Sequence, residues 1–209
     1  SLIDPVAGSK LAIAESLTNI VFAPMKDNLK SVSLSANWMW PAKNKGENAR
    51  LYDAVESVSD FACDLGINIP TGKDSLSMVQ KYPNGDKVYS PGTVVISASG
   101  EIDDIKNIVE PVIISNVNTS LLYIDFSKDE FKLGGSILGQ IINKLGEKTP
   151  TIIDNTYFAE TFNTVQGLIK SNKVLSGHDI SEGGMITALL EMNFANVNGG
   201  MNINLNGFR

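Results

Sequence analysis

Two polar side chains near the start of the chain have the spacing of a shared helical face. Glu15 and Asn19 are four residues apart, and side chains at this spacing lie on the same side of a helix. Their carboxylate and amide oxygens are hard ligands of the kind that Mg²⁺ binds. The pair therefore indicates a candidate metal site. An ordinary solvated helix surface explains the same spacing, and it is the more common case.

A second candidate lies at residues 178–184, His178-Asp179-Ile180-Ser181-Glu182-Gly183-Gly184. The apolar residues before it predict a strand that ends here, and Ser181 is typical of a helix N-cap. Free backbone N–H groups at a helix N-terminus favour a bound anion, and Asp179 can hold the Mg²⁺ that accompanies a phosphate. A plain capped strand-to-helix turn explains these residues equally well.

A third group, Gly72-Lys73-Asp74-Ser75, has the ending of a phosphate-binding P-loop but not its context. A P-loop needs a glycine five positions before Gly72 and a helix after it, whereas the residue there is Ile67 and residues 76–78 favour a strand. We therefore reject the P-loop. Lys73 remains a candidate point charge for a phosphate, placed on a short loop.

The elements that must position these groups are both helical and extended. Helices are predicted where apolar residues recur at helical spacing, over 5–21, 51–65, 137–145, 158–169 and 185–192. Strands are predicted over 32–38, 67–69, 93–99, 121–126, 174–180 and 201–205, with a hairpin over 76–89 that turns at Asn84-Gly85 in type I′ geometry. The fold class is α+β, in two mixed units without a regular βαβ rhythm.

Composition excludes several classes of protein. The 209 residues carry a net charge of −6 and no dense Lys/Arg run, which argues against a nucleic-acid partner. No apolar run reaches the length of a membrane span, so no membrane partner is expected. One cysteine, Cys63, excludes an intrachain disulfide and fits the cytoplasm, and it reads as an inert helix residue. The single histidine, His178, is more often structural than catalytic.

Five motifs occur in one order and together resemble a known family. They are Glu15-Ser16-Leu17-Thr18-Asn19-Ile20, Ser33-Leu34-Ser35-Ala36-Asn37-Trp38-Met39, Leu51-Tyr52-Asp53-Ala54-Val55, Pro70-Thr71-Gly72-Lys73-Asp74-Ser75-Leu76-Ser77-Met78 and His178-Asp179-Ile180-Ser181-Glu182-Gly183-Gly184. Over nearly the whole chain the sequence is similar to the large form of phosphoribosylformylglycinamidine synthase. The likeness is to a middle slice of the second of its two halves, each of which is like aminoimidazole ribonucleotide synthetase.

The resemblance implies a division of the chain and a reaction. Residues 1–101 would be the later part of the N-terminal synthetase-like domain, 102–116 a linker, and 117–209 the earlier part of the C-terminal domain, both truncated. The family is a cytoplasmic ligase of purine biosynthesis. It uses glutamine as amide donor and ATP to convert formylglycinamide ribonucleotide to the amidine. The glutaminase region and the family's catalytic histidine would lie outside this chain, which we expect to be inactive alone.

The resemblance also implies roles for particular residues. Glu15, Asn19 and Asp179 take the family's Mg²⁺-ligand positions, and Ser181 takes a position that contacts the nucleotide, ATP or ADP. No catalytic residue is expected in this segment. The implied partners are the remaining domains of the same enzyme, formylglycinamide ribonucleotide and ATP. The two groups from opposite ends of the chain should face a common cleft.

Two alternative interpretations and one expected interaction stand beside this assignment. One alternative is a scaffold whose nucleotide is structural and is never turned over. Another is a relative of selenophosphate synthetase or thiamine-phosphate kinase, which share the architecture. Self-association is expected through the N-terminal sheet, whose unpaired face would expose Val32, Leu34 and Val94 or Val95.

Overall fold

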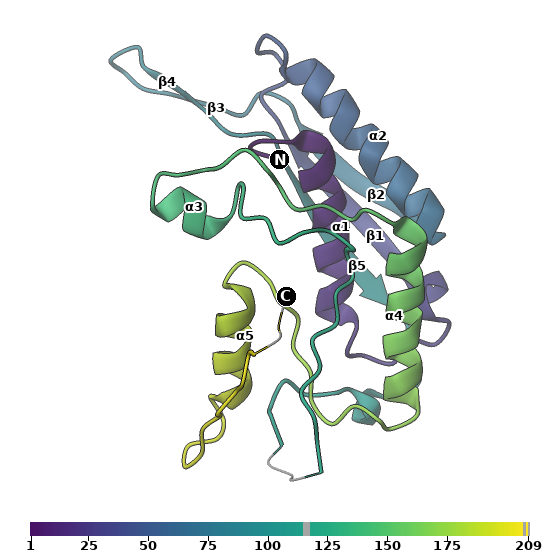
Figure 1. Ribbon diagram of the computed structural model, residues 1–209. Coiled ribbons are helices and arrows are strands. Elements are labelled where there is room, and N and C mark those ends of the chain that lie inside the picture. The colour runs from purple at the N-terminus through teal and green to yellow at the C-terminus, as the bar shows by residue number, and fades with distance from the viewer. Residues whose placement is uncertain (115–117, 207, 209) are drawn as a thin grey trace.

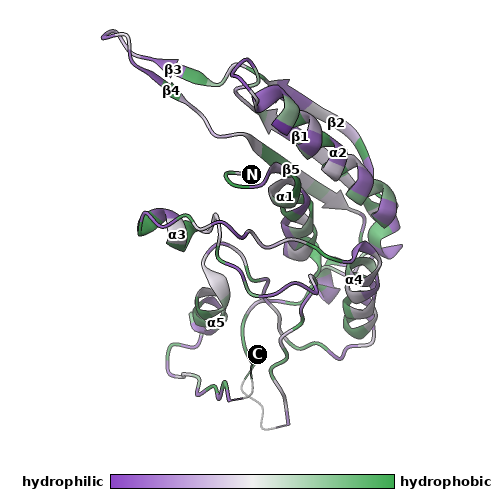
Figure 2. Ribbon diagram, turned by 45° about the horizontal axis from the view of Figure 1, so that its top comes forward, coloured by the Kyte–Doolittle hydropathy of each residue, from purple (hydrophilic) through white to green (hydrophobic). Residues whose placement is uncertain are grey.

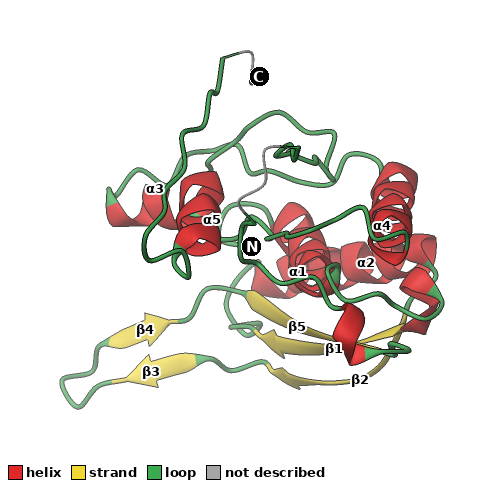
Figure 3. Ribbon diagram, turned by 90° about the horizontal axis from the view of Figure 1, so that it is seen from below, coloured by secondary structure: helices red, strands yellow, loops and turns green. Residues whose placement is uncertain are grey.

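The N-terminal part of the protein is a three-stranded sheet with two helices on one face. A computed structural model describes residues 1–114, 118–206 and 208. The strands β1 (Val32–Met39), β2 (Asn68–Ser75) and β5 (Thr93–Gly100) form a sheet in the order β2-β1-β5. The helices α1 (Pro5–Ile20) and α2 (Glu47–Leu65) pack on each other over this sheet (Figures 1 and 3). The predicted α+β class is confirmed.

Local sequence explains where the two long helices begin and end. The Asp4 carboxylate caps α1 by accepting hydrogen bonds from the backbone N–H groups of Val6 (2.9 Å) and Ala7 (3.0 Å). Pro5 occupies the first turn, where its missing N–H costs nothing. The helix α2 lies between Gly46 and Gly66, both with positive φ. It starts four residues before the predicted position.

The sheet buries the apolar side of its central strand against the helices. Val32, Leu34 and Ala36 on β1 are buried, while Ser33 and Ser35 point to the opposite face. The expectation that an open face would expose Val32, Leu34 and either Val94 or Val95 is therefore wrong for Val32 and Leu34, which are buried with Val94, whereas Val95 is exposed. Alternation defines two faces of a strand, and the helices cover the apolar one.

Two details in the region 68–89 differ from the prediction. The strand β2 extends to Ser75 and pairs in parallel with β1, so Lys73 lies on a strand opposite Asn37 and not on a loop. The hairpin of β3 (Val79–Lys81) and β4 (Lys87–Tyr89) has no type I′ turn. Such a turn needs positive φ at both Asn84 and Gly85, and only Gly85 has it. The Gly85 N–H instead donates to the Tyr82 carbonyl (3.0 Å).

The described residues after 101 form helices and irregular segments but no strand. The helices are η2 (Ile105–Asn107), α3 (Ile137–Ile141), α4 (Asn155–Lys170) and α5 (Gly184–Asn193), and η1 (Asn28–Ser31) precedes β1. The strands predicted over 121–126, 174–180 and 201–205 are wrong. Alternation or an apolar run shows that a segment can pair, but a strand forms only where the fold supplies a partner.

One hydrophobic core joins the two predicted units. Phe158, Phe162 and Ile169 on α4 are buried in the same cluster as Leu17 of α1 and Phe61 of α2. Figure 1 shows α4 beside the lower end of these helices, and Figure 2 shows hydrophobic and hydrophilic residues alternating along them. The predicted linker ends and the second unit begins at 115–117, which lie outside the described residues.

A buried glutamine fastens α4 to the segment that follows α1. The Gln166 side chain is fully buried, and its Nε2 donates to the carbonyl oxygens of Val21 (2.6 Å) and Ala23 (3.0 Å). Its Oε1 accepts from the Met25 N–H (2.7 Å). Buried polar groups need such partners, so this side chain fixes the backbone of residues 21–25.

Candidate metal and nucleotide site

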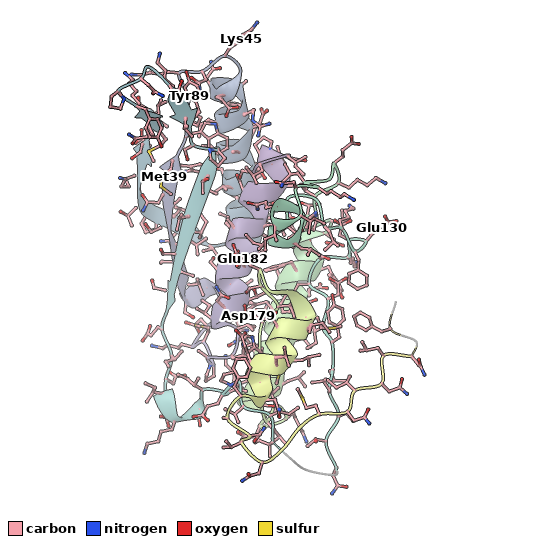
Figure 4. All side chains as sticks on the ribbon, turned by 90° about the vertical axis from the view of Figure 1, so that its left-hand side faces the viewer. Met39, Lys45, Tyr89, Glu130, Asp179 and Glu182 are labelled. Carbon is pink, nitrogen blue, oxygen red and sulfur yellow. The ribbon has the colours of Figure 1, made fainter. Side chains whose placement is uncertain are left out.

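Residues from opposite ends of the chain line one cleft beside α1. This acidic cleft has a volume of about 300 Å³ and is lined by Glu15, His178, Asp179, Ser181, Glu182, Gly183, Gly184, Thr187, Ala188 and Glu191. Glu15 comes from α1, Glu191 from α5, and the others from α5 or the loop before it. Figure 4 shows Asp179 and Glu182 on that loop, in front of α1.

Asn19 lies beside the acidic cleft rather than in it. Glu15 and Asn19 are both exposed on α1, as expected for residues one turn apart. Asn19 lines a neighbouring cleft of about 430 Å³, whose walls are mostly apolar. His178 and Asp179 line both clefts, so Asp179 stands between the two predicted ligands of the first unit.

Ser181 does not cap α5. The N-cap residue of that helix is Gly183, which provides no side-chain hydrogen bond. The Ser181 hydroxyl instead donates to Oδ2 of Asp179. The plain capped-turn interpretation is therefore wrong in its main contact, and the strand expected before Asp179 is a loop. The hydrogen bond orients the carboxylate that the sequence singles out as a metal ligand.

The histidine links the loop to α5. In the structure His178 Nδ1 lies 2.7 Å from the Asp179 carbonyl oxygen, and Nε2 lies 3.1 Å from Oε2 of Glu191. Sequence reasoning missed Glu191, because it stands seven residues beyond the glycine turn. Glu191 could have been found from its distance of seven residues from Gly184, because residues seven apart on a helix share one face.

Negative charges face Glu15 across the cleft. Partial removal from water raises the pKa of the Glu15 carboxyl above its usual range, and the charges of Glu182 and Asp179 raise it further. Carboxylates that repel one another in this way are poised to bind a cation, which relieves the repulsion.

The donor set fits Mg²⁺ accompanied by a phosphate. Among the described residues, no group of three or more His, Cys, Asp or Glu side chains is arranged to hold a metal ion by itself. Mg²⁺ in proteins usually takes one or two carboxylates and completes its shell with water and phosphate oxygens. A bound Mg²⁺ would find the carboxylates of Glu15 and Asp179 in the acidic cleft and the amide oxygen of Asn19 in the neighbouring one.

The phosphate candidate Lys73 and the cysteine expected to be inert, Cys63, lie away from this site. Lys73 is exposed on β2 and lines neither cleft, so the structure does not bring it to Glu15 or Asp179. Cys63 is exposed on α2 and is likewise absent from both linings. The site therefore consists of the exposed face of α1, the loop before α5 and one side of α5.

Glu15→Gln is expected to stabilise the protein at pH 7 in the absence of divalent cations. A raised pKa means that the folded state binds this proton more strongly, so stability falls as pH rises through the raised pKa. Because Glu15 is exposed and its interactions are screened by solvent, the expected gain is only about 0.5 kcal/mol. The gain should vanish below the usual glutamate pKa of 4.5.

Urea unfolding at several pH values measures this effect. Glu160→Gln, an exposed glutamate on α4, is the matched control and should change little. A Glu15→Gln protein that is less stable than the wild type at pH 7 would contradict the electrostatic assignment.

Comparison with known proteins identifies relatives over nearly the whole chain. Residues 1–101 match the family model described as FGAR-AT PurM_N-like domain. An Arabidopsis thaliana protein named "Probable phosphoribosylformylglycinamidine synthase, chloroplastic/mitochondrial" is 42% identical over 205 residues, which are 98% of this chain and 14% of the relative. The Homo sapiens phosphoribosylformylglycinamidine synthase is 42% identical over 196 residues, 93% of this chain and 14% of that protein.

Solved structures share the fold at low sequence identity. The Thermotoga maritima PurL structure described as complexed with ATP has a TM-score of 0.55 at 12% identity. The match covers 95% of this chain and 28% of the PurL chain. The Thermotoga maritima PurL structure described as complexed with FGAR has a TM-score of 0.52 at 14% identity, and the match covers 92% of this chain and 29% of that PurL chain. Residues 1–101 match the FGAR-AT PurM_N-like domain model, and 93–98% of the chain is similar to a segment of proteins named phosphoribosylformylglycinamidine synthase.

Proposed function

We propose that the acidic cleft is a Mg²⁺–nucleotide site within an ATP-dependent ligase. The observation that carries the proposal is that Glu15 and Asp179, from opposite ends of the chain, line one cleft. Glu15, Asn19 and Asp179 are the proposed metal ligands, and Ser181 the proposed nucleotide contact. ATP and ADP are the proposed nucleotides, in keeping with the PurL structure described as complexed with ATP.

The chain's own residues bind and orient the phosphates. When bound, Mg²⁺ supplies positive charge that neutralises phosphate oxygens. The Ser181 hydroxyl donates to Oδ2 of Asp179, and Oδ1 of the same carboxylate lies 3.5 Å from Nδ1 of His178. The Gly184 N–H donates to the Ser181 carbonyl oxygen (2.9 Å), and the proposed anion would be held by the N–H groups that follow it in the first turn of α5, which no side chain caps. Lys73 remains a proposed phosphate contact only for a group that reaches β2.

The proposed reaction belongs to the longer protein and not to this chain alone. The chain spans 14% of the length of the curated relatives described above. We propose that the whole enzyme is a glutamine amidotransferase that converts formylglycinamide ribonucleotide, glutamine and ATP to the amidine. The proposed partners are its remaining domains. The division at 1–101, 102–116 and 117–209 and self-association through the sheet are parts of the same proposal.

Asp179→Asn in the full-length protein tests the site. Replacing the carboxylate with an amide keeps its shape but removes the charge that attracts the cation, so affinity for Mg·ADP should fall at least tenfold, within the range seen when metal-site interactions are lost. Calorimetric titration with Mg·ADP measures the loss, and Asp125→Asn, a carboxylate away from the cleft, is the control. Unchanged affinity in Asp179→Asn would refute the site.

The same variant separates a catalytic site from a structural one. Loss of both binding and amidine formation would indicate turnover at this cleft. Loss of binding with normal amidine formation would indicate the scaffold alternative, in which the bound nucleotide only stabilises the fold.

The compartment remains a proposal. Within the described residues, no helix is both long and apolar enough to cross a membrane. We propose the cytoplasm from the single cysteine, whereas the name of the Arabidopsis thaliana relative assigns that protein to the chloroplast and mitochondrion.

A further inference from the structure

Gly177, just before the acidic cleft, lies directly against the ring of Phe22. A β-carbon on Gly177 would lie 2.0 Å from Cε1 of Phe22, 2.6 Å from Cδ1 and 2.8 Å from Cζ. Non-bonded carbon atoms approach to about 3.5–4.0 Å, so no side chain fits at this position while the ring stays in place. Backbone conformation is not the reason for glycine here, since Gly177 is not among the glycines with positive φ.

Hydrogen bonds hold the backbone at Phe22 in place. The Gln166 side chain holds the carbonyl oxygens of the residues on either side of it, Val21 and Ala23. The Phe22 carbonyl oxygen accepts a hydrogen bond from the Val109 N–H (3.0 Å). With its backbone held on both sides, Phe22 can give way to an added methyl group only by rotating its half-buried side chain.

The same short segment also holds Gly177. The Gly177 N–H donates to the carbonyl oxygen of Glu110 (3.2 Å), the residue after the one that binds Phe22. The next two residues along the chain, His178 and Asp179, line the acidic cleft with Glu15. The contact between Gly177 and Phe22 therefore lies two residues from Asp179 along the chain.

We propose that Gly177 is a positioning residue for the metal site. Its missing side chain lets the loop before α5 rest on Phe22, and this contact places the Asp179 carboxylate opposite Glu15. Gly177 itself contacts neither metal nor phosphate. The inference rests on the proposed function, because it assigns a residue that acts through the proposed ligand Asp179.

Gly177→Ala in the full-length protein tests the inference. The measured quantity is the affinity for Mg·ADP at the site whose binding is lost in Asp179→Asn. Gly177→Ala should weaken it at least tenfold, and Phe22→Ala combined with Gly177→Ala should restore it to within threefold of Phe22→Ala alone. Because removing the Phe22 ring also relieves any destabilisation that the methyl group causes, binding is compared at a temperature where circular dichroism shows that all the variants are folded. Gly167→Ala, where no atom lies within 4 Å of the added carbon, is the matched control and should leave binding unchanged.

The outcomes separate this inference from the proposed function. If Asp179→Asn binds Mg·ADP as tightly as the wild type does, the proposed function and the positioning role of Gly177 are both refuted. Binding that depends on Asp179 but is within threefold of wild type in Gly177→Ala overturns the positioning role alone. If Gly177→Ala does not fold, Phe22→Trp applies the same displacement from the other side with Gly177 intact. It should lose binding at least tenfold, and unchanged binding in that variant overturns the inference.

Discussion

Replacing Gln166 with leucine is expected to lower the free energy of unfolding by about 2–4 kcal/mol. The leucine fills a similar volume but makes no hydrogen bonds. It leaves the Met25 N–H and the carbonyl oxygens of Val21 and Ala23 buried without their partner. Each such group costs about 1–3 kcal/mol when unsatisfied, and local rearrangement recovers part of the total.

Urea unfolding of the wild type and of Gln166→Leu measures this loss. Gln140→Leu is the matched control, because Gln140 is exposed and its hydrogen bond to the Gly135 carbonyl oxygen lies at the surface. That variant should differ from the wild type by less than about 0.5 kcal/mol. Equal stabilities for Gln166→Leu and Gln140→Leu would show that the buried network contributes nothing.

Gly72→Ala is expected to cause a loss of similar size, about 2–4 kcal/mol, although Gly72 is exposed. A β-carbon at this position would lie 2.1 Å from the carbonyl oxygen of Ala36, its partner on β1. The obstacle is backbone in the central strand, so no side-chain rotation can make room. The methyl group must force β2 away from β1.

Thermal or urea unfolding followed by circular dichroism measures the effect of Gly72→Ala. The control is Gly200→Ala, because no atom lies within 4 Å of the added carbon there. If Gly72→Ala unfolds at the same urea concentration as the wild type, the close parallel pairing of β1 with β2 is wrong.

Sequence patterns determined the elements whose information is local. The helical spacing of apolar residues predicted α1, α2, α4 and α5, and alternation predicted β1 and β5. Helices close their own hydrogen bonds within a few residues, so their pattern and caps are complete in the sequence. The same residues supported the family resemblance, which the relatives confirm.

Patterns were insufficient where a segment needs a distant partner. Residues 121–126 are mostly apolar and residues 201–205 alternate, but neither segment forms a strand among the described residues. The turn at Gly85 failed for a related reason, since the dipeptide Asn84-Gly85 allows type I′ geometry but does not require it. In both cases sequence showed what the backbone can adopt and not what its neighbours allow.

Only the tertiary structure decided how the site is assembled. Sequence pointed to Glu15, Asn19 and Asp179 one motif at a time, and the fold placed Asp179 between the clefts that hold the other two. It also added Glu191, which no motif contains, and replaced a helix cap with the Ser181–Asp179 hydrogen bond. The cleft itself joins residues far apart in the chain, Glu15 and residues 178–191, and its geometry depends on how α1 and the loop before α5 pack. Local spacing carries no information about that packing.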